Sequence, residues 1–550
     1  MPNEPDRVVV RMYRGVLGDC FLLTVWQGGT AKVAMIDCGV LQNVRPGPEM
    51  IDRLPRPVVD FVGEDVLAKV EGTKDAVRSI EADIVAYLAG RNLDLLVITH
   101  DHYDHVAGFT LPDDENVFMQ SSFGIDQLWL SWVEDPADTQ ARSLAARFAK
   151  SKEAVALAAE VGRQAASQED DALAEALEQV QALAAFIGPI AHPGLPAVPE
   201  RTKTTTQSIQ AMREKVGANT RFLVPGQVIA PKEGIGLKVY VLAPPRDEKK
   251  RLFKDLPTGT GEAREVYLTR VDDAAAVAGV AFAQLHGMAA AGKTDMKPAQ
   301  LAEVSDKQHL DPLPFARPHA RPYPPGPDDK PTSPPGDKPE RVKGWEELRA
   351  AYEDEANDYR SISGDWTEAA GSLALKLDSD TNNTSLVLAF ELPDGRVLLF
   401  PGDAQIGNWE SWGDQLYPAT PVEGERQQTI EEILRRVVFY KVGHHASHNA
   451  TARARGLELM TDPRLCAAIP VVEAVAKVQG PGKKTPDKGW KMPFTHLHDE
   501  LKKKTGGRIV NGDGDPLDEA KAFAAKDVGV SVRHQDSDTG GRWVELTFPL

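Results

Sequence analysis

The feature that most constrains the fold of this chain is a predicted strand followed directly by a group of histidines. Residues 93–99 form an apolar run that predicts a buried strand, and the next six residues contain His100, His102, Asp104 and His105. Neutral imidazole nitrogens and a carboxylate suit zinc, and they also suit iron or manganese. The pattern therefore predicts a metal site at the end of a strand, whereas the plainer alternative is a histidine-rich surface turn.

The spacing of these side chains favours two metal ions over one. His100 and His102 are two residues apart, so they can project together where the strand ends. Asp104 and His105 follow in a turn and can face a second ion beside the first. Two ions about 3.5–4 Å apart can activate a shared water molecule and stabilise the leaving oxygen.

Other strand-like segments also end in candidate ligands. They are residues 33–39 with Asp37, residues 396–403 with Asp403, residues 437–447 with His444 and His445, and residues 15–20 with Asp19, which precede a strand at 21–26. Each ending is weak by itself, because a Gly-Asp pair after a strand is usually turn chemistry. Together they predict that several strands bring ligands to one sheet edge.

These motifs resemble those of the metallo-β-lactamase superfamily, whose H-x-H-x-D-H signature is present in full at residues 100–105. Within it, the chain is most similar to the hydrolase domain of the competence protein ComEC and to related phosphorylcholine esterases. That branch shares a G-x-G-D opening, here at 15–19 with wider spacing, and an N-N-x-S-L-V-L run, here at 382–388. It also shares a strand ending in G-D at 402–403 and K-V-x-H-H-G-S at 441–447. The likeness covers residues 8–131, 220–245 and 381–513.

The resemblance implies an α/β fold, a four-layer αββα sandwich with metal ions at one edge between two β-sheets. Two large insertions would interrupt this core. The expected division is core at 1–134, a helical insertion at 135–218, core strands at 219–245, a second insertion at 246–380 and the rest of the core at 381–550. The insertions would form walls around the metal edge and so govern access to it.

The two insertions differ in composition. Residues 138–187 are rich in Ala, Glu, Gln and Leu without internal proline, which predicts two or three helices. Residues 312–339 are dense in proline and charged residues, so they cannot bury a core and predict an extended linker or surface loop. Binding of a protein partner in the polyproline conformation is an alternative role for that segment.

The resemblance also implies which residues hold the metals. Two divalent ions, zinc foremost with manganese or iron as alternatives, would be held by His100, His102, Asp104, His105, Asp403 and His444. Asp403 would bridge the two ions. His444 is preferred over His445 because it directly follows the strand. His445 would otherwise bind metal or donate a proton to the leaving group.

Further expectations concern five residues around the ions. Asp104 and His445 are the expected catalytic residues, and Asp37 is expected to orient a ligand imidazole. Asn383 and Ser385 would either donate hydrogen bonds to substrate oxygens or form a turn.

Two departures from the superfamily pattern affect these expectations. Many members supply one more histidine ligand before the Gly-Asp strand, and His192 is the only histidine here in a turn-like setting that could fill that role. Ala446 replaces the glycine of H-H-G-S. If that position needs a positive φ, alanine strains the turn, and if not, the change is harmless.

Composition bears on the number of cores, on nucleic-acid binding and on the cellular compartment. A chain of 550 residues is too long for one core. Its net charge of −18 argues against broad non-specific binding of nucleic acid, which depends on Lys and Arg contacts to phosphates. The three cysteines lie in apolar strand contexts, as expected of core residues in a reducing compartment. The polar start and the absence of apolar runs of about 18 residues predict a cytoplasmic protein without membrane spans.

The motifs favour a metal-dependent hydrolase that uses water activated by its ions. The expected substrate is a phosphodiester, either a nucleic acid, a nucleotide or another phospho-ester. One alternative is hydrolysis of a lactam, lactone or thioester at the same site. The other is a partner-docking module, in which the insertions bind a protein and the metal site is regulated.

Overall fold

The computed structural model describes residues 5–41, 72–167, 171–198, 201–254, 365–419, 426–447, 449–479, 490–525, 528–535 and 541–550. The proline-rich residues 312–339 lie outside these ranges, as does most of the expected second insertion. Among the described helices, none combines the length and apolar character needed to cross a membrane.

The first layer of the core is an eight-stranded mixed sheet in the order β16-β17-β1-β2-β3-β4-β5-β6. Its strands are rich in β-branched and aromatic residues, as in CFLLTVWQ of β2. The pairings from β16 to β3 are antiparallel, and those from β3 to β6 are parallel. The bounds are β1 (Arg7–Tyr13), β2 (Cys20–Gln27), β3 (Thr30–Cys38), β4 (Leu95–Val97), β5 (Leu128–Ser131), β6 (Thr220–Leu223), β16 (Ser531–His534) and β17 (Trp543–Pro549).

The second layer is a seven-stranded sheet in the order β15-β14-β13-β10-β9-β8-β7. Strands β10, β13, β14 and β15 are parallel, whereas β7, β8, β9 and β10 pair antiparallel. The bounds are β7 (Val228–Ile229), β8 (Lys238–Ala243), β9 (Val387–Glu391), β10 (Val397–Phe400), β13 (Val437–Lys441), β14 (Cys466–Ile469) and β15 (Ile509–Asn511). A separate two-stranded sheet joins β11 (Tyr417–Pro418) to β12 (Gln427–Gln428).

The two large sheets pack face to face through a buried apolar core. Phe21 of β2 meets Phe400 of β10 with ring centroids 5.8 Å apart. Phe439 of β13 meets Phe548 of β17 at 6.1 Å. All four rings are at most 2% exposed, so this interface excludes water and fixes how the strand ends of one sheet lie against those of the other.

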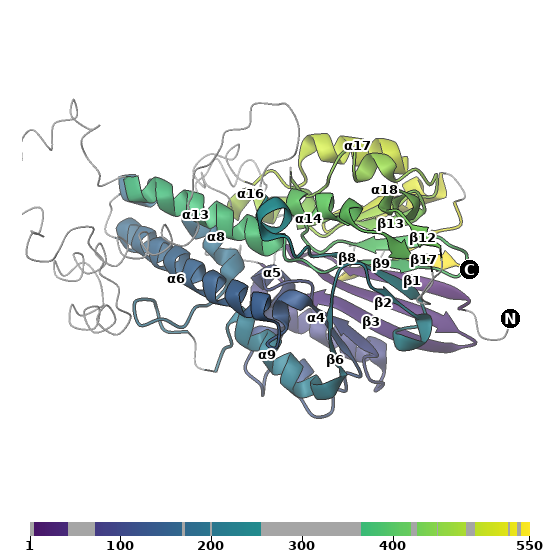
Figure 1. Ribbon diagram of the computed structural model, residues 1–550, viewed down its shortest axis with the longest axis horizontal. Coiled ribbons are helices and arrows are strands. Elements are labelled where there is room, and N and C mark those ends of the chain that lie inside the picture. The colour runs from purple at the N-terminus through teal and green to yellow at the C-terminus, as the bar shows by residue number, and fades with distance from the viewer. Residues whose placement is uncertain are drawn as a thin grey trace, which may run out of the picture.

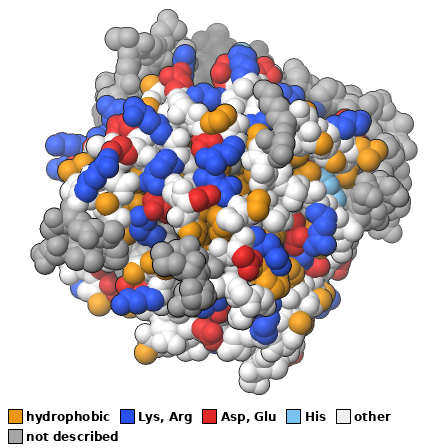
Figure 2. All heavy atoms as spheres, turned by 90° about the vertical axis from the view of Figure 1, so that its right-hand side faces the viewer, with side chains coloured by type: hydrophobic (Ala, Val, Ile, Leu, Met, Phe, Trp, Pro, Cys, Tyr) orange, Lys and Arg blue, Asp and Glu red, His pale blue; other side chains and the backbone are white. Residues whose placement is uncertain are grey.

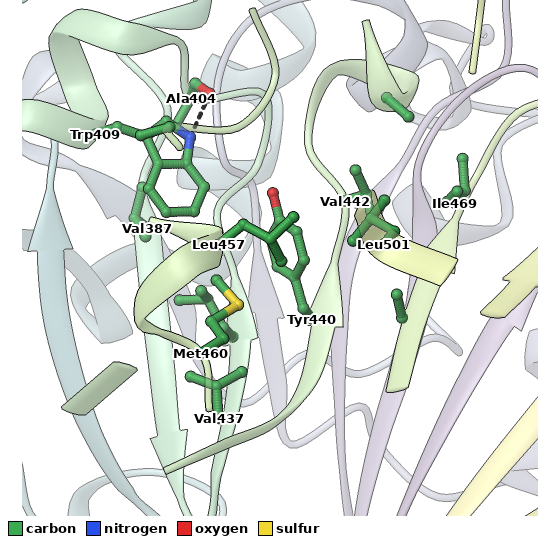
Figure 3. Close-up of a cluster of buried hydrophobic side chains, with 14 of the residues drawn as sticks. Val387, Ala404, Trp409, Val437, Tyr440, Val442, Leu457, Met460, Ile469 and Leu501 are labelled. Carbon is green, nitrogen blue, oxygen red and sulfur yellow. Dashed lines mark hydrogen bonds between the residues drawn. The ribbon is translucent and has the colours of Figure 1, made fainter. Parts of the chain in front are cut away.

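Helices cover the outer face of each sheet (Figure 1). The first sheet is covered by α4 (Thr73–Leu88), α5 (Tyr103–Thr110) and α9 (Thr205–Val216), and the second by α14 (Ile406–Ser411), α15 (Ile430–Leu434), α16 (Glu473–Gln479) and α17 (Thr495–Thr505). On the second sheet, Trp409 of α14 packs near Tyr440 of β13 and donates a hydrogen bond to the Ala404 carbonyl (Figure 3). The remaining helix of this half, α18 (Pro516–Ala524), adds Phe523 to the core between the sheets. These layers agree with the expected α/β sandwich.

The alanine-rich segment forms helices, as its composition predicts. They are α6 (Thr139–Ser167), α7 (Asp171–Ala176) and α8 (Glu178–Ile187), and α13 (Asp365–Asn382) packs against them in a separate apolar core. Figure 1 shows α6, α8 and α13 extending together from one end of the sandwich. The Lys152 ammonium of α6 reaches Asp101, within the histidine motif, at 2.6 Å from both carboxylate oxygens. The helical insertion therefore contacts the metal-motif loop directly.

Candidate metal centre

Strand ends from both sheets bring the candidate ligands to one edge. In the first sheet β3 and β4 are parallel neighbours, and Asp37 lies at the end of β3 while His100 follows β4. In the second sheet β10 and β13 are parallel neighbours, and they are followed by Asp403 and His445. The carboxyl ends of parallel neighbours meet at one edge of a sheet, which is where sites form in such folds.

Helix α5 begins directly after His102 and carries two more candidates in its first turn, Asp104 and His105. A close backbone approach holds this turn in place. A Cβ atom added at Gly39 would lie 1.8 Å from the Asp104 carbonyl oxygen, so only glycine fits there. The Asp104 carbonyl also accepts a hydrogen bond from the Asp19 N–H at 2.9 Å. The Asp-Cys-Gly ending of β3 and the Gly-Asp before β2 thus position the metal motif.

Four side chains form a buried group that can hold a metal ion: Asp104, His105, Asp403 and His445. The His445 Nε2 atom lies 2.6 Å from Asp104 Oδ2, and His105 Nε2 lies 3.2 Å from Asp403 Oδ2. Ligand atoms of all four lie within 4.8 Å of one another, and each residue is at most 1% exposed. Two carboxylates and two imidazoles are a donor set that zinc, iron and manganese accept.

Several buried atoms of this cluster have no hydrogen-bond partner in the protein. They are His100 Nε2, Asp104 Oδ1, His105 Nε2, Asp403 Oδ2 and Asp19 Oδ1. A buried polar atom left unsatisfied costs roughly 1–3 kcal/mol, and more if it is charged. Their gathering in one place is therefore unfavourable for the protein alone. A bound cation would satisfy the lone pairs of the imidazoles and carboxylates together, so the residues fit a metal ion.

His100 and His102 lie beside the group of four. The His100 ring centroid is 4.8 Å from that of His102 and 4.2 Å from that of His105. Burial lowers the pKa of His102 to about 4 and the pKa of His100 well below its ordinary value. Both imidazoles are therefore neutral at physiological pH, which is the form that binds metals.

The ring of His105 is held in one orientation by Asp37. The His105 Nδ1 atom lies 2.7 Å from Asp37 Oδ2, and Asp37 also accepts hydrogen bonds from the Thr99 N–H and hydroxyl, each at 2.7 Å. With Nδ1–H donated to Asp37, the Nε2 atom faces the cluster, where loss of its proton gives a lone pair for a metal ion. Asp19, Asp37 and His105 also lie close enough to form a second possible ligand group. Because Asp37 already accepts three hydrogen bonds, we interpret that group as support for His105.

Lys441, the first residue of the motif at 441–447, is a further residue of the site, and the motif alone does not indicate its role. It ends β13 and is 1% exposed. Its ammonium donates to Asp403 Oδ1 at 2.9 Å and to the Gly402 carbonyl at 2.8 Å, and it forms an ion pair with Asp19. Burial lowers the pKa of Lys441, but Asp19 and Asp403 raise it more, so the pKa lies above its ordinary value and the lysine stays charged.

The hydrogen bonds to Asp403 leave one of its oxygens for the cluster. Its Oδ1 atom accepts from Lys441 and from the His444 N–H at 2.8 Å. Its Oδ2 atom therefore faces His105. Burial raises the pKa of Asp403, but Lys441 and the neighbouring histidines lower it to well below the ordinary value. Asp403 is thus an ionised carboxylate with one oxygen directed to the metal group.

Between the two adjacent histidines, the geometry favours His445 as the candidate ligand. The His445 Nε2 atom faces Asp104, and its Nδ1 atom lies 3.0 Å from the Pro470 carbonyl, to which it can donate. The His444 Nδ1 atom contacts the Ser447 hydroxyl at 2.7 Å, and its Nε2 atom lies 4.0 Å from Asp378 Oδ2. The preference for His444 relied on distance along the chain from the strand. The backbone turns sharply here, with φ of 44° at His444 and 50° at His445, so the two rings face different partners.

The left-handed stretch continues into Ala446, whose φ is 59°. The glycine usual at this position would adopt that conformation without strain, whereas alanine costs about 1–2 kcal/mol. We expect Ala446→Gly to raise the free energy of unfolding by about 1 kcal/mol, measured by urea denaturation. Ala452→Gly is the matched control, because Ala452 is also buried but lies outside this stretch, and it should destabilise. An equal loss in both variants would contradict strain at Ala446.

Asn383 and Ser385 are held by hydrogen bonds within the protein. Both are fully buried, and the Asn383 side chain accepts from the Asn408 N–H at 3.0 Å. The Ser385 hydroxyl oxygen accepts from the Asp403 N–H at 3.1 Å. Their polar atoms contact protein, so of the two expected roles the geometry favours turn formation. Through Ser385 the turn also fixes the backbone of Asp403.

Asp378 of α13 is a carboxylate near the cluster that the sequence analysis did not single out. Its Oδ1 atom is buried without a hydrogen-bond partner. Burial, followed by the charges of Asp104 and Asp403, raises the pKa of Asp378 to about 8. His192, considered as an extra ligand, accepts a hydrogen bond from the Gly194 N–H at 2.9 Å and is not in the ligand groups described above.

Comparisons with protein-family models, with curated proteins and with solved structures found no match for this chain. The buried His/Asp cluster on a mixed α/β fold therefore carries the functional interpretation.

Proposed function

We propose that this chain is a metal-dependent hydrolase of the metallo-β-lactamase type and that it cleaves phosphodiesters. The observation that carries the proposal is the set of unpartnered buried imidazole and carboxylate atoms at the strand ends. Proteins seldom leave such atoms unsatisfied, and functional sites are where exceptions gather.

Two divalent ions fit the donor set, with zinc foremost. One would be held by Asp104, His105 and His445 and the other by His100 and His102, with Asp403 shared between them. Bound ions would supply an activated water and offset the negative charge that develops on the substrate. Their charge would also balance the carboxylates of the cluster, which outnumber its single lysine.

The residues around this cluster have positioning roles in the proposed reaction. Asp37 keeps the His105 proton on Nδ1, so Nε2 remains available as a ligand. Lys441 and the His444 N–H hold Asp403 by one oxygen. The Pro470 carbonyl accepts from His445 and so directs its Nε2 atom to Asp104. A preorganised ligand set of this kind lowers the cost of reorganisation during the reaction.

A phosphodiester is favoured over the alternatives by the likeness of the motifs to the ComEC branch. Hydrolysis of a lactam, lactone or thioester needs the same cluster and remains the second candidate. Long nucleic acids fit less well than small esters. The chain carries a net charge of −18, and Figure 2 shows Lys and Arg interspersed with Asp and Glu over one face instead of forming a single basic field.

Metal-dependent turnover of bis-p-nitrophenyl phosphate tests the proposal. We expect turnover that chelation abolishes and added zinc or manganese restores, with nitrocefin hydrolysed poorly. Asp403→Ala should lose more activity than Asp37→Ala, because Asp403 would contact both ions and Asp37 acts through His105. Turnover of nitrocefin alone would favour the lactam alternative. Near-wild-type turnover in Asp403→Ala would contradict the shared ligand.

A further inference from the structure

A pocket of about 530 Å³ opens beside the metal cluster. Helix α8 of the helical insertion and helix α13, which packs against it, form one side, and the residues after β13 and before α17 form the other. His444 and Asp378 lie on its polar side, next to the cluster. The volume is in the range of sites that bind small organic molecules.

Aromatic side chains connect this pocket to the metal site. The ring of Phe186, on α8, lies 5.8 Å from the ring of His102 and stacks on Trp490 with centroids 5.1 Å apart. Leu375 of α13 and Met492 add apolar surface. Leu375 is 48% exposed, so its side chain is accessible to a molecule in the pocket. A substrate bound at the metals can therefore extend an apolar group along this wall.

The charged residues that line the pocket are two lysines, Lys376 and Lys491, and one aspartate, Asp378, so the lining offers few cations to a polyanion. The described lysine on α13, Lys376, lies 2.5 Å from Asp380 and also donates to the Phe253 carbonyl at 3.0 Å. Asp378 adds a carboxyl group on the same side. A nucleic-acid strand needs cations along its path, whereas an uncharged group does not.

We propose that this pocket binds an uncharged apolar group, aromatic or aliphatic, of a small ester whose phosphoryl group reaches the metal cluster. This inference rests on the proposed function and names the substrate class: small organic phospho-esters, not nucleic-acid strands. The helical insertion thereby supplies specificity, while the sandwich supplies the metal ligands.

Binding of two phosphonates tests the proposal without turnover. Phenylphosphonate and methylphosphonate present the same head group to the zinc-loaded protein but differ in apolar surface. We expect calorimetry to give about tenfold tighter binding of phenylphosphonate. Leu375→Glu and Trp490→Ala should reduce this preference to about twofold or less by the same reasoning on buried area. Leu517→Glu is the matched control, because Leu517 is also an exposed helical leucine but lies on α18, and it should keep the full preference.

The outcomes distinguish failure of the pocket assignment from failure of the proposed hydrolase activity. Equal binding of the two phosphonates, or a preference that survives in both pocket variants, would overturn the pocket assignment even if phosphodiesters are hydrolysed. A phenyl preference that both variants remove would support it even if no phosphodiester is turned over, in which case only the proposed reaction fails. Tighter binding of an oligonucleotide than of phenylphosphonate would also overturn it.

Discussion

His445→Ala is expected to remove one of two bound metal ions and to abolish turnover, whereas His444→Ala should keep both ions. The physical reason is the direction of each ring. His445 Nε2 lies 2.6 Å from Asp104 Oδ2 and its Nδ1 is used by a backbone carbonyl, so no other side chain can replace it. Loss of residues that merely orient a ligand costs roughly 10- to 100-fold in metal affinity, so loss of a ligand should cost more.

The two histidines are a matched pair for this experiment. They are adjacent, both are at most 7% exposed, and both have a left-handed backbone, so each alanine variant removes a similar side chain from a similar place. The metal content of purified protein is measured by plasma emission spectroscopy, and activity is followed in the same samples. If His445→Ala kept two ions and His444→Ala lost one, His444 and not His445 would be the metal ligand.

Metal binding to this group should also release protons. Burial lowers the pKa of His445, but Asp403 and Asp104 raise it above its ordinary value, and the pKa of His105 is raised further by the surrounding carboxylates. Without metal these imidazoles therefore hold protons that a cation must displace. The apparent metal affinity is expected to rise as the pH increases through and above the ordinary pKa of histidine, and a flat profile would contradict the pairing of these histidines with metal.

The sequence sufficed for features that depend on neighbouring residues. The six-residue histidine motif and the strands ending in Asp37 and Asp403 could be recognised because ligand spacing and strand period are local. The helices at 138–187 could be predicted because alanine-rich segments without proline favour them. The structure then places these strand ends at one edge of the sandwich.

What could not be predicted depends on contacts between distant segments or on a single turn. The directions of the His444 and His445 rings depend on three consecutive positive φ angles, for which the sequence gives no signal beyond Ala446 in a glycine position. Asp378 lies in a helix of an insertion. It does not follow a strand, so the pattern of ligands at strand ends does not indicate it. Lys441 is recognisable in the sequence as a charged residue at the end of an apolar strand. Its partners, Asp403 and Asp19, lie 38 and 422 residues away along the chain, so the sequence does not indicate the contacts.

Lys441→Met is expected to be the most destabilising single change near the site. Asp19 and Asp403 would lose their buried counterion, and breaking a buried ion pair on one side costs about 3–5 kcal/mol. Methionine keeps a similar apolar length, so the loss would report on charge and hydrogen bonding instead of a cavity. The free energy of unfolding of metal-free protein in urea measures this effect.

Lys521→Met is the control for removing a paired lysine. Its partner is Asp518, and both side chains are about three quarters exposed, at 75% and 77%, so solvent screens the pair and the change should leave the free energy of unfolding close to that of wild type. Added zinc should recover part of the stability of Lys441→Met, because a cation bound to Asp403 replaces some of the lost positive charge. It should bind more weakly than to wild type, since Asp403 Oδ1 is no longer held. If Lys441→Met unfolded like the control and bound zinc like wild type, Lys441 would have no positioning role and the orientation of Asp403 would rest on Ser385 and the His444 N–H alone.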